Sequence, residues 1–165
     1  MAEIKSGANP LFLREEELRQ GLELLFYATR DFNAEPDAIL ARHKFGRAHH
    51  RVIYFVGRHP SITVGQLLSI LGITKQSLSR VLRQLINQGL ITQRPGPTDR
   101  RQRLLELTSK GIEMEHQLSE KQRVRIARAY REAGAEAVEG FRKVLLGLTR
   151  QEMPGKFQPP GRLDR

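Results

Sequence analysis

The sequence contains no cysteine and no tryptophan, and it has no long apolar run. Without cysteine the chain can form no disulfide, no thiolate zinc site and no thiol redox sensor. No apolar segment approaches the roughly 18 residues of a membrane-spanning helix, and the first residues lack the apolar stretch of a signal peptide. We therefore expect a cytoplasmic protein. Its 165 residues, of which 39% are hydrophobic, are enough for one domain with a real core.

Acidic side chains are almost missing from the middle of the chain. Residues 41–103 hold 12 Lys and Arg but only one acidic residue, Asp99, whereas residues 1–40 hold 4 basic and 8 acidic residues. The net charge of +10 therefore comes from the middle of the sequence. Such a block favours a polyanionic partner, nucleic acid before a membrane, unless it is only the solvated face of an ordinary fold.

Helical periodicity covers most of the sequence. Apolar residues recur at spacings of three and four, and glycines and prolines mark the breaks. Gly72 and Gly89 are expected to end helices, and Thr74 and Ser109 are expected to cap the helices that follow them. The predicted helices span residues 11–30, 37–57 with a break at Gly46, 64–71, 75–88, 109–132 and 135–148.

Two short strands are predicted between the fourth and fifth of these helices. Residues 90–94 are rich in β-branched side chains, residues 103–108 return with alternating leucines, and residues 95–99 between them have the composition of a turn. The fold class is thus mainly α with a small β-hairpin wing. The segments expected are an N-terminal dimerisation region (11–40), a winged helix-turn-helix (41–110), C-terminal dimerisation helices (111–150) and a tail (151–165).

A helix-turn-helix followed by a basic hairpin suits double-stranded DNA, because a helix fits the major groove. The outward face of the second helix is expected to carry hydrogen-bond donors at its start. Gln76 is suited to bind adenine, Arg80 to bind guanine or a phosphate, and Arg83 to bind the DNA backbone. The candidate contacts on this helix are Thr74, Lys75, Gln76, Ser77, Ser79, Arg80 and Arg83.

The hairpin tip supplies a second set of candidate contacts, namely Asp99, Arg100, Arg101 and Arg103. The two-residue offset is expected to let the Asp99 carboxylate hold the Arg101 guanidinium in a fixed pose. A pre-organised arginine suits the negative potential of a narrow minor groove. The alternative is that the residues of the helix are only the solvated face of an amphipathic helix, and that those of the hairpin tip are only a solvated basic loop.

These motifs resemble the MarR family of bacterial transcription regulators. The resemblance rests on Leu71-Gly-Ile-Thr-Lys-Gln-Ser-Leu-Ser-Arg80, Gly89-Leu-Ile, Asp99-Arg-Arg and Leu107-Thr-Ser-Lys-Gly111. It implies a homodimer with interlocking terminal helices, recognition helices in successive major grooves and wing arginines in the minor groove. It also implies a small phenolic or other organic effector in many members. The stretch from Phe45 to Arg51 differs from the Leu-Thr-x-x-Gln pattern that is common there.

Apolar stripes at the two chain ends predict a dimer independently of the resemblance. A winged helix occupies only the middle of the chain, so these stripes either cap its core or pair with a second copy. A second copy also doubles the DNA site, with half-sites about 10–11 base pairs apart. The candidate interface residues are Leu18, Leu22, Leu25, Phe141, Val144, Leu145 and Leu148.

An effector pocket for a small aromatic or anionic compound is a further hypothesis. Aromatic walls and cations are the parts such a pocket needs, and the alternative is that the aromatic residues are core and the arginines are solvated. The candidates are Tyr27, Arg30, Phe45, Arg47, His49, His50 and Tyr54. The five histidines predict no metal site, because the adjacent pair His49-His50 points in different directions and no carboxylate lies between His43 and His59.

The sequence therefore predicts a homodimeric, sequence-specific DNA-binding regulator, a repressor that a small effector releases, with a pseudo-palindromic operator and no cofactor. No enzyme motif such as a phosphate loop or Gly-x-Ser-x-Gly occurs, so an enzyme is not expected. The alternative is a winged-helix module that binds chromosomes non-specifically or binds proteins, without an effector. Salt separates the two, because a regulator keeps a sequence preference as salt rises, whereas a purely electrostatic binder loses its affinity without showing one.

Overall fold

The computed structural model of the protein describes residues 10–149. This part of the chain is mainly helical with one small sheet, as the sequence predicts. The predicted tail over residues 151–165 lies outside the described residues. The elements in order are η1 (Leu11–Leu13), α1 (Glu15–Arg42), α2 (Arg47–Arg58), β1 (Ile62–Thr63), α3 (Val64–Leu71), α4 (Lys75–Asn87), β2 (Ile91–Pro95), β3 (Arg103–Leu107), α5 (Ser109–Ala133) and α6 (Ala135–Leu148).

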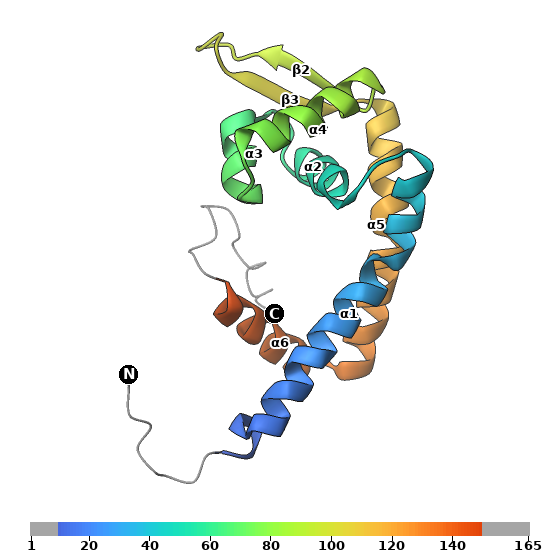
Figure 1. The fold of residues 1–165 in the computed structure, drawn as a ribbon, viewed down its shortest axis with the longest axis vertical. Helices are drawn as coiled ribbons and strands as arrows, with labels where there is room; N and C mark the ends of the chain where they lie inside the picture. Colours follow the sequence, from blue (N-terminus) through green and yellow to red (C-terminus); the bar gives the residue numbers. More distant parts are fainter. Residues whose placement is uncertain (1–9, 150–165) are drawn as a thin grey trace, which may run out of the picture.

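The winged helix forms one end of the molecule and two long helices lead away from it (Figure 1). Helices α2, α3 and α4 lie beside the sheet at that end. Helix α5 starts at the sheet and runs next to α1, and α6 turns back from the far end of α5. The two segments expected to mediate dimerisation therefore meet in space at the end opposite the wing.

The sheet has three strands, and the sequence predicts only two of them. All pairs are antiparallel in the order β1–β3–β2, with Leu105 opposite both Ile62 and Gln93. The prediction of an isolated hairpin is thus wrong by one strand. Strand β1 has two residues, which is too few for an alternation of apolar and polar side chains to reveal it.

The hydrophobic core lies almost wholly inside the winged helix. Apart from Pro36, the buried apolar side chains of residues 10–149 number sixteen and fall between Leu40 and Leu118. Helix α4 contributes Leu78 and Leu85, which have no exposed surface. Because burying one such side chain is worth roughly 1.5–3 kcal/mol, this packing holds α4 in one orientation and fixes which of its residues face solvent.

Caps at the helix ends follow the predictions at α4 but not at α5. Gly72 ends α3 with a φ of 61°, and the Thr74 hydroxyl caps α4 by accepting from the Ser77 N–H at 3.2 Å. The predicted cap Ser109 is wrong by one residue. The hydroxyl of Thr108 accepts from the Gly111 N–H at 3.0 Å and donates to the Gly89 carbonyl at 2.6 Å.

Helix α1 is continuous where the sequence suggests two helices, and Pro36 lies inside it. Proline has no N–H, so the carbonyl of Phe32, four residues earlier, loses its helical partner. The side-chain amide of Gln122 on α5 donates to that carbonyl at 3.3 Å. The tertiary contact between α5 and α1 thus supplies the missing hydrogen bond.

Candidate nucleic-acid interface

Helix α4 presents a polar face opposite its buried one. Gln76, Ser79, Arg80 and Arg83 are exposed, and with the half-buried Ser77 they line a shallow hollow of about 520 Å³. Positions 76, 80 and 83 are spaced by four and three residues, so they follow one face of the helix. The structure therefore brings together the predicted major-groove residues. The exposed Thr74 acts as the helix cap, and its hydroxyl is bound to that of Ser77.

Most cations of α4 and the wing have no carboxylate partner within residues 10–149, and Arg94 is the exception. Eight arginine–carboxylate ion pairs and one contact between His116 and Glu120 occur among residues 10–149, on α1, α2, α5, α6 and the strands of the wing. None of these pairs includes a predicted DNA contact. The exposed cations of α4 and the wing that are in no ion pair within residues 10–149 are Lys75, Arg80, Arg83, Arg100, Arg101 and Arg103. Such a surface attracts polyanions.

The wing tip is ordered by hydrogen bonds of its own backbone, and this corrects one prediction. The Asp99 carboxylate accepts from the backbone N–H of Arg101 at 2.9 Å and forms no ion pair with its guanidinium. The N–H of Gly96 donates to the Gln102 carbonyl and closes the loop. Asp99 therefore shapes the turn, and the exposed guanidinium of Arg101 keeps all its donors free.

Arg94 is the one cation of the hairpin that is not among the predicted DNA contacts. Its Nη2 donates to Glu106 at 3.0 Å and to the Ser61 hydroxyl at 3.0 Å, and Ser61 donates to the same Glu106 oxygen at 2.7 Å. The bonds from Ser61 and Arg94 lower the pKa of Glu106 below its ordinary value. A diagonal pair of opposite charges on β2 and β3 was the signal that could have revealed this network at the base of the wing.

A second candidate site is a cavity of about 560 Å³ between α1, α2 and α5. Three of the predicted effector residues line it, namely Arg47, His50 and Tyr54. The sequence missed the wall that α5 supplies, because no local pattern shows which face of a distant helix returns to α2. That wall includes Gln122, Arg123, Ile126 and Tyr130, and Arg51 of α2 adds a further cation.

The other four predicted effector residues lie elsewhere. Phe45 is 8% exposed and belongs to the core, where its ring stacks on that of His49. The Arg30 guanidinium lies over the Tyr27 ring at 4.9 Å, and neither residue lines the cavity. Tyr54, by contrast, is 38% exposed, so the alternative that it is a core residue does not hold.

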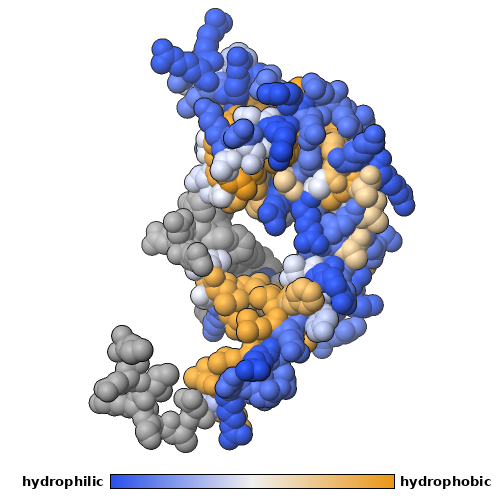
Figure 2. Space-filling model, in the orientation of Figure 1, coloured by the Kyte–Doolittle hydropathy of each residue, from blue (hydrophilic) through white to orange (hydrophobic). Residues whose placement is uncertain are grey.

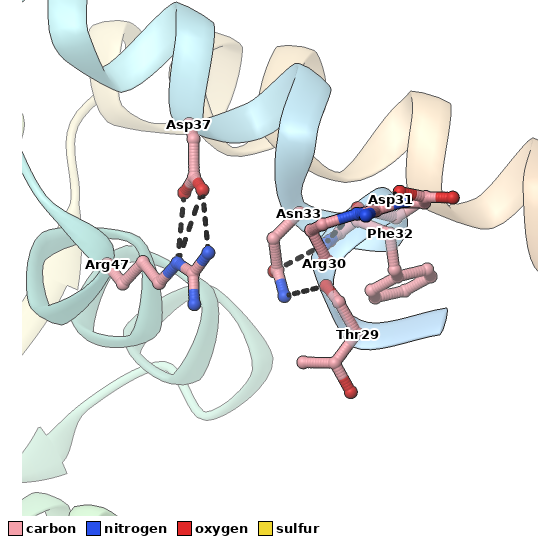
Figure 3. A network of polar contacts seen from close by, with 8 residues as sticks. Thr29, Arg30, Asp31, Phe32, Asn33, Asp37 and Arg47 are labelled. Carbon is pink, nitrogen blue, oxygen red and sulfur yellow. Dashed lines mark hydrogen bonds and ion pairs between the residues drawn. The ribbon is translucent and has the colours of Figure 1, made fainter. Parts of the chain in front are cut away.

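Charge inside the cavity is partly neutralised. Arg47 binds the Asp37 carboxylate through Nε and Nη2, with the shortest distance 2.9 Å (Figure 3). Burial lowers the pKa of His50 below its ordinary value, against the opposing effects of Asp37 and Glu115, while Arg51 lowers it further. Within residues 10–149 no cluster of three His, Asp or Glu is placed to hold a metal ion, and no helix is long and apolar enough to span a membrane.

Comparison with known proteins decides the family. A model of the MarR family matches residues 43–102, which include α2, α3, α4 and most of the wing. The HTH-type transcriptional regulator PetP of Rhodobacter capsulatus is 53% identical over 152 residues, which are 92% of each chain. The chain belongs to the MarR family. Proteins of this family are DNA-binding transcription regulators that act as dimers, so the chain is a transcription regulator rather than a member of an enzyme family.

Solved structures share the fold. A MarR family transcription regulator, SP03579, superposes with a TM-score of 0.68 at 22% identity, over 82% of this chain and 89% of the other. RV1404 from Mycobacterium tuberculosis gives 0.62 at 25% identity, over 81% and 93%. A mutant MarR from E. coli, solved in complex with operator DNA, gives 0.59 at 21% identity, over 84% and 97%.

Proposed function

We propose that the protein is a homodimeric repressor that binds a pseudo-palindromic operator and is released by a small aromatic or anionic effector. The observation that carries the proposal is the division of the surface. Six unpaired cations lie on α4 and the wing, and unpartnered apolar side chains lie on α1 and α6 at the other end. Residues 41–110 would bind DNA, while residues 11–40 and 111–150 would form the dimer. Such a protein works in the cytoplasm, beside its DNA.

In the proposed complex the exposed face of α4 enters the major groove. Gln76 reads adenine and Arg80 reads guanine, whereas Lys75 and Arg83 neutralise phosphates. The wing reaches the adjacent minor groove with Arg100 and Arg101, and Arg103 lies opposite Pro95 at the tip end of β3. Thr74, Ser77 and Ser79 complete the surface, and Asp99 holds the tip in shape. The operator-bound relative of the same fold supports this docking.

The proposed dimer interface is a groove of about 800 Å³ between α1, α5 and α6. Figure 2 shows the corresponding band of hydrophobic surface below the winged helix. Leu25, Phe141 and Leu145 line the groove, and Leu18, Leu22, Val144 and Leu148 extend it with side chains at least half exposed. A second copy covers this surface with the same residues, because a two-fold axis pairs a patch with itself.

The cavity between α1, α2 and α5 is the proposed effector site. Arg51 has no carboxylate partner within residues 10–149, so its charge is available to an anion, and Phe32, Tyr54 and Tyr130 offer aromatic walls. A panel of aromatic carboxylates tests this by thermal unfolding. An acid at about 100 times its Kd stabilises the protein by about 2.7 kcal/mol, which raises Tm by several degrees. Arg51→Gln should remove the rise, and a panel without any effect contradicts the site.

Selection of duplexes from a random-sequence pool tests the DNA-binding proposal. The wild-type protein should enrich a two-fold-related motif, and Arg101→Ala should weaken its binding by about 1–3 kcal/mol, or roughly 5- to 150-fold. Arg128→Ala is the matched control, because Arg128 is an exposed arginine on α5 away from the wing. A non-specific chromosome-binding protein would enrich no motif and would lose all affinity as salt rises, and that outcome would favour the alternative.

A further inference from the structure

The first turn of α2 contacts the recognition helix through one histidine. The His49 Nε2 lies 2.6 Å from the Gln84 Oε1 on α4, and the His49 Nδ1 lies 3.1 Å from the backbone nitrogen of Gly46. The imidazole ring also stacks on Phe45, with 4.7 Å between ring centroids. His49 is thus held on three sides, by the linker before α2, by the core and by α4.

This geometry fixes where the proton of His49 resides. A backbone N–H can only donate, so Nδ1 accepts from Gly46 and carries no hydrogen. The proton of the neutral ring is then on Nε2, which donates to the Oε1 of Gln84. Because the carboxamide oxygen is held, the amide of Gln84 cannot turn over, and its NH2 group points away from His49.

Gln84 lies on the same face of α4 as the residues proposed to meet DNA. It follows Arg80 by four residues and Gln76 by eight, and it is exposed. An NH2 group two turns from the start of a recognition helix lies at the edge of the groove, where the acceptors are phosphate oxygens. We propose that Gln84 donates to the DNA phosphate backbone and that His49 is the positioning residue that fixes its amide for this bond. This inference rests on the proposed DNA-binding function.

The test is a double-mutant cycle on a duplex selected by the wild-type protein. His49→Ala and Gln84→Ala should each weaken binding about three- to tenfold, which is the worth of one hydrogen bond. The double variant should be no weaker than the weaker single variant, because His49 acts only through Gln84. His49→Gln keeps an acceptor for Gly46 and a donor for Gln84, so it should restore binding to within about twofold of wild type.

Controls separate positioning from folding. His59→Ala changes a histidine at the other end of α2 that stacks on Phe55, and it should leave DNA affinity unchanged. Since a phosphate contact carries no sequence information, a scrambled duplex should lose the same factor as the selected one. Nitrogen-15 NMR of the histidine side chains should show His49 protonated at Nε2 and bare at Nδ1.

Several results would overturn the inference. Additive losses in the cycle, unchanged affinity of His49→Ala, or a proton on Nδ1 would each remove His49 as the positioning residue. A loss confined to the selected duplex would assign Gln84 to a base instead of a phosphate. If the wild-type protein enriches no duplex at all, the proposed function fails and this inference fails with it.

Discussion

At the residue scale, His50 makes the stability of the protein depend on pH. The ring is half-buried at the cavity wall, and burial lowers its pKa below the ordinary value of 6.5. In the unfolded chain the same ring has its ordinary pKa, so near that pH the unfolded state binds more protons than the folded state. Stability from this group is therefore complete above 6.5 and is lost as pH falls from there towards the lowered pKa of the folded state.

Unfolding by urea at two pH values checks this expectation. The urea concentration at the unfolding midpoint of the wild-type protein should decrease when pH is lowered from about 7.5 to about 5.5, the range in which histidine titrates. His50→Asn removes the titrating group, so its midpoint should fall less. His116→Asn, which changes an exposed histidine on α5, should behave as wild type. Equal falls in the wild-type protein and in His50→Asn would show that burial of His50 contributes nothing.

The wing tip shows what a residue-level prediction can and cannot reach. The motif predicts a bond from the Asp99 carboxylate to the Arg101 guanidinium, and this prediction is wrong, although the carboxylate is within reach of Arg101. The spacing does not say which donor is reached. The backbone N–H is fixed close to the carboxylate, whereas the guanidinium would have to fold back at a cost in side-chain entropy. The structure has the backbone bond, which leaves the guanidinium of Arg101 free.

At the element scale, the start of α5 connects this long helix to α4 and the wing. Thr108 caps α5 and also donates to the carbonyl of Gly89, which follows α4. A side chain at Gly111 would place its Cβ 2.0 Å from the Leu90 carbonyl oxygen, so only glycine allows α5 to approach so closely. The Leu-Thr-x-x-Gly motif is thus a packing device that joins α4, β2 and α5.

Substitution of the cap measures the strength of this joint. Thr108→Ala should lower the free energy of unfolding by about 1 kcal/mol, as expected for the loss of a helix N-cap, and more if the bond to Gly89 contributes separately. Ser109→Ala is the matched control, because Ser109 is the exposed residue next to the cap and should change stability little. Chemical denaturation of the two variants measures the free energy of unfolding of each and shows which residue caps α5. A larger effect at Ser109 would restore the capping role predicted from the sequence.

Helix boundaries were predictable where the signal was local and failed where a distant element supplied a bond. The glycine and threonine signals around α3 and α4 are read from neighbouring residues, and the structure confirms them. The continuity of α1 through Pro36 depends on Gln122, which lies 90 residues from the carbonyl that it binds. Strand β1 likewise exists only because β3 offers a free edge to it.

At the scale of the whole molecule, one end buries its own apolar side chains and the other end leaves them exposed. The winged helix buries its own apolar residues, whereas α6 has no buried residue at all and α1 buries only Pro36 and Leu40. The periodicity of the two terminal segments predicted apolar stripes correctly. What the sequence could not supply was their meeting in one groove with α5, since that depends on the turn at Gly134 and the path of two long helices.

The oligomeric state follows from this division and can be tested at one residue. Leu145 is 37% exposed and lines the groove between α1, α5 and α6. Leu145→Glu would bring a charge into the proposed interface, and an unpaired charge cannot be buried without a large desolvation cost. The variant should therefore shift from dimer to monomer in light scattering, and it should lose affinity for a two-fold-symmetric duplex because only one recognition helix remains per particle.

Ile112→Glu supplies the control for this shift. Ile112 is more exposed than Leu145, at 59%, but it lies in the first turn of α5, outside the groove. The same charge placed there should leave the dimer intact, so a general effect of the substitution on folding or solubility is separated from an effect on the interface. A Leu145→Glu protein that stays dimeric and binds the symmetric duplex with wild-type affinity would show that the second copy docks elsewhere, and the apolar groove would then need another occupant.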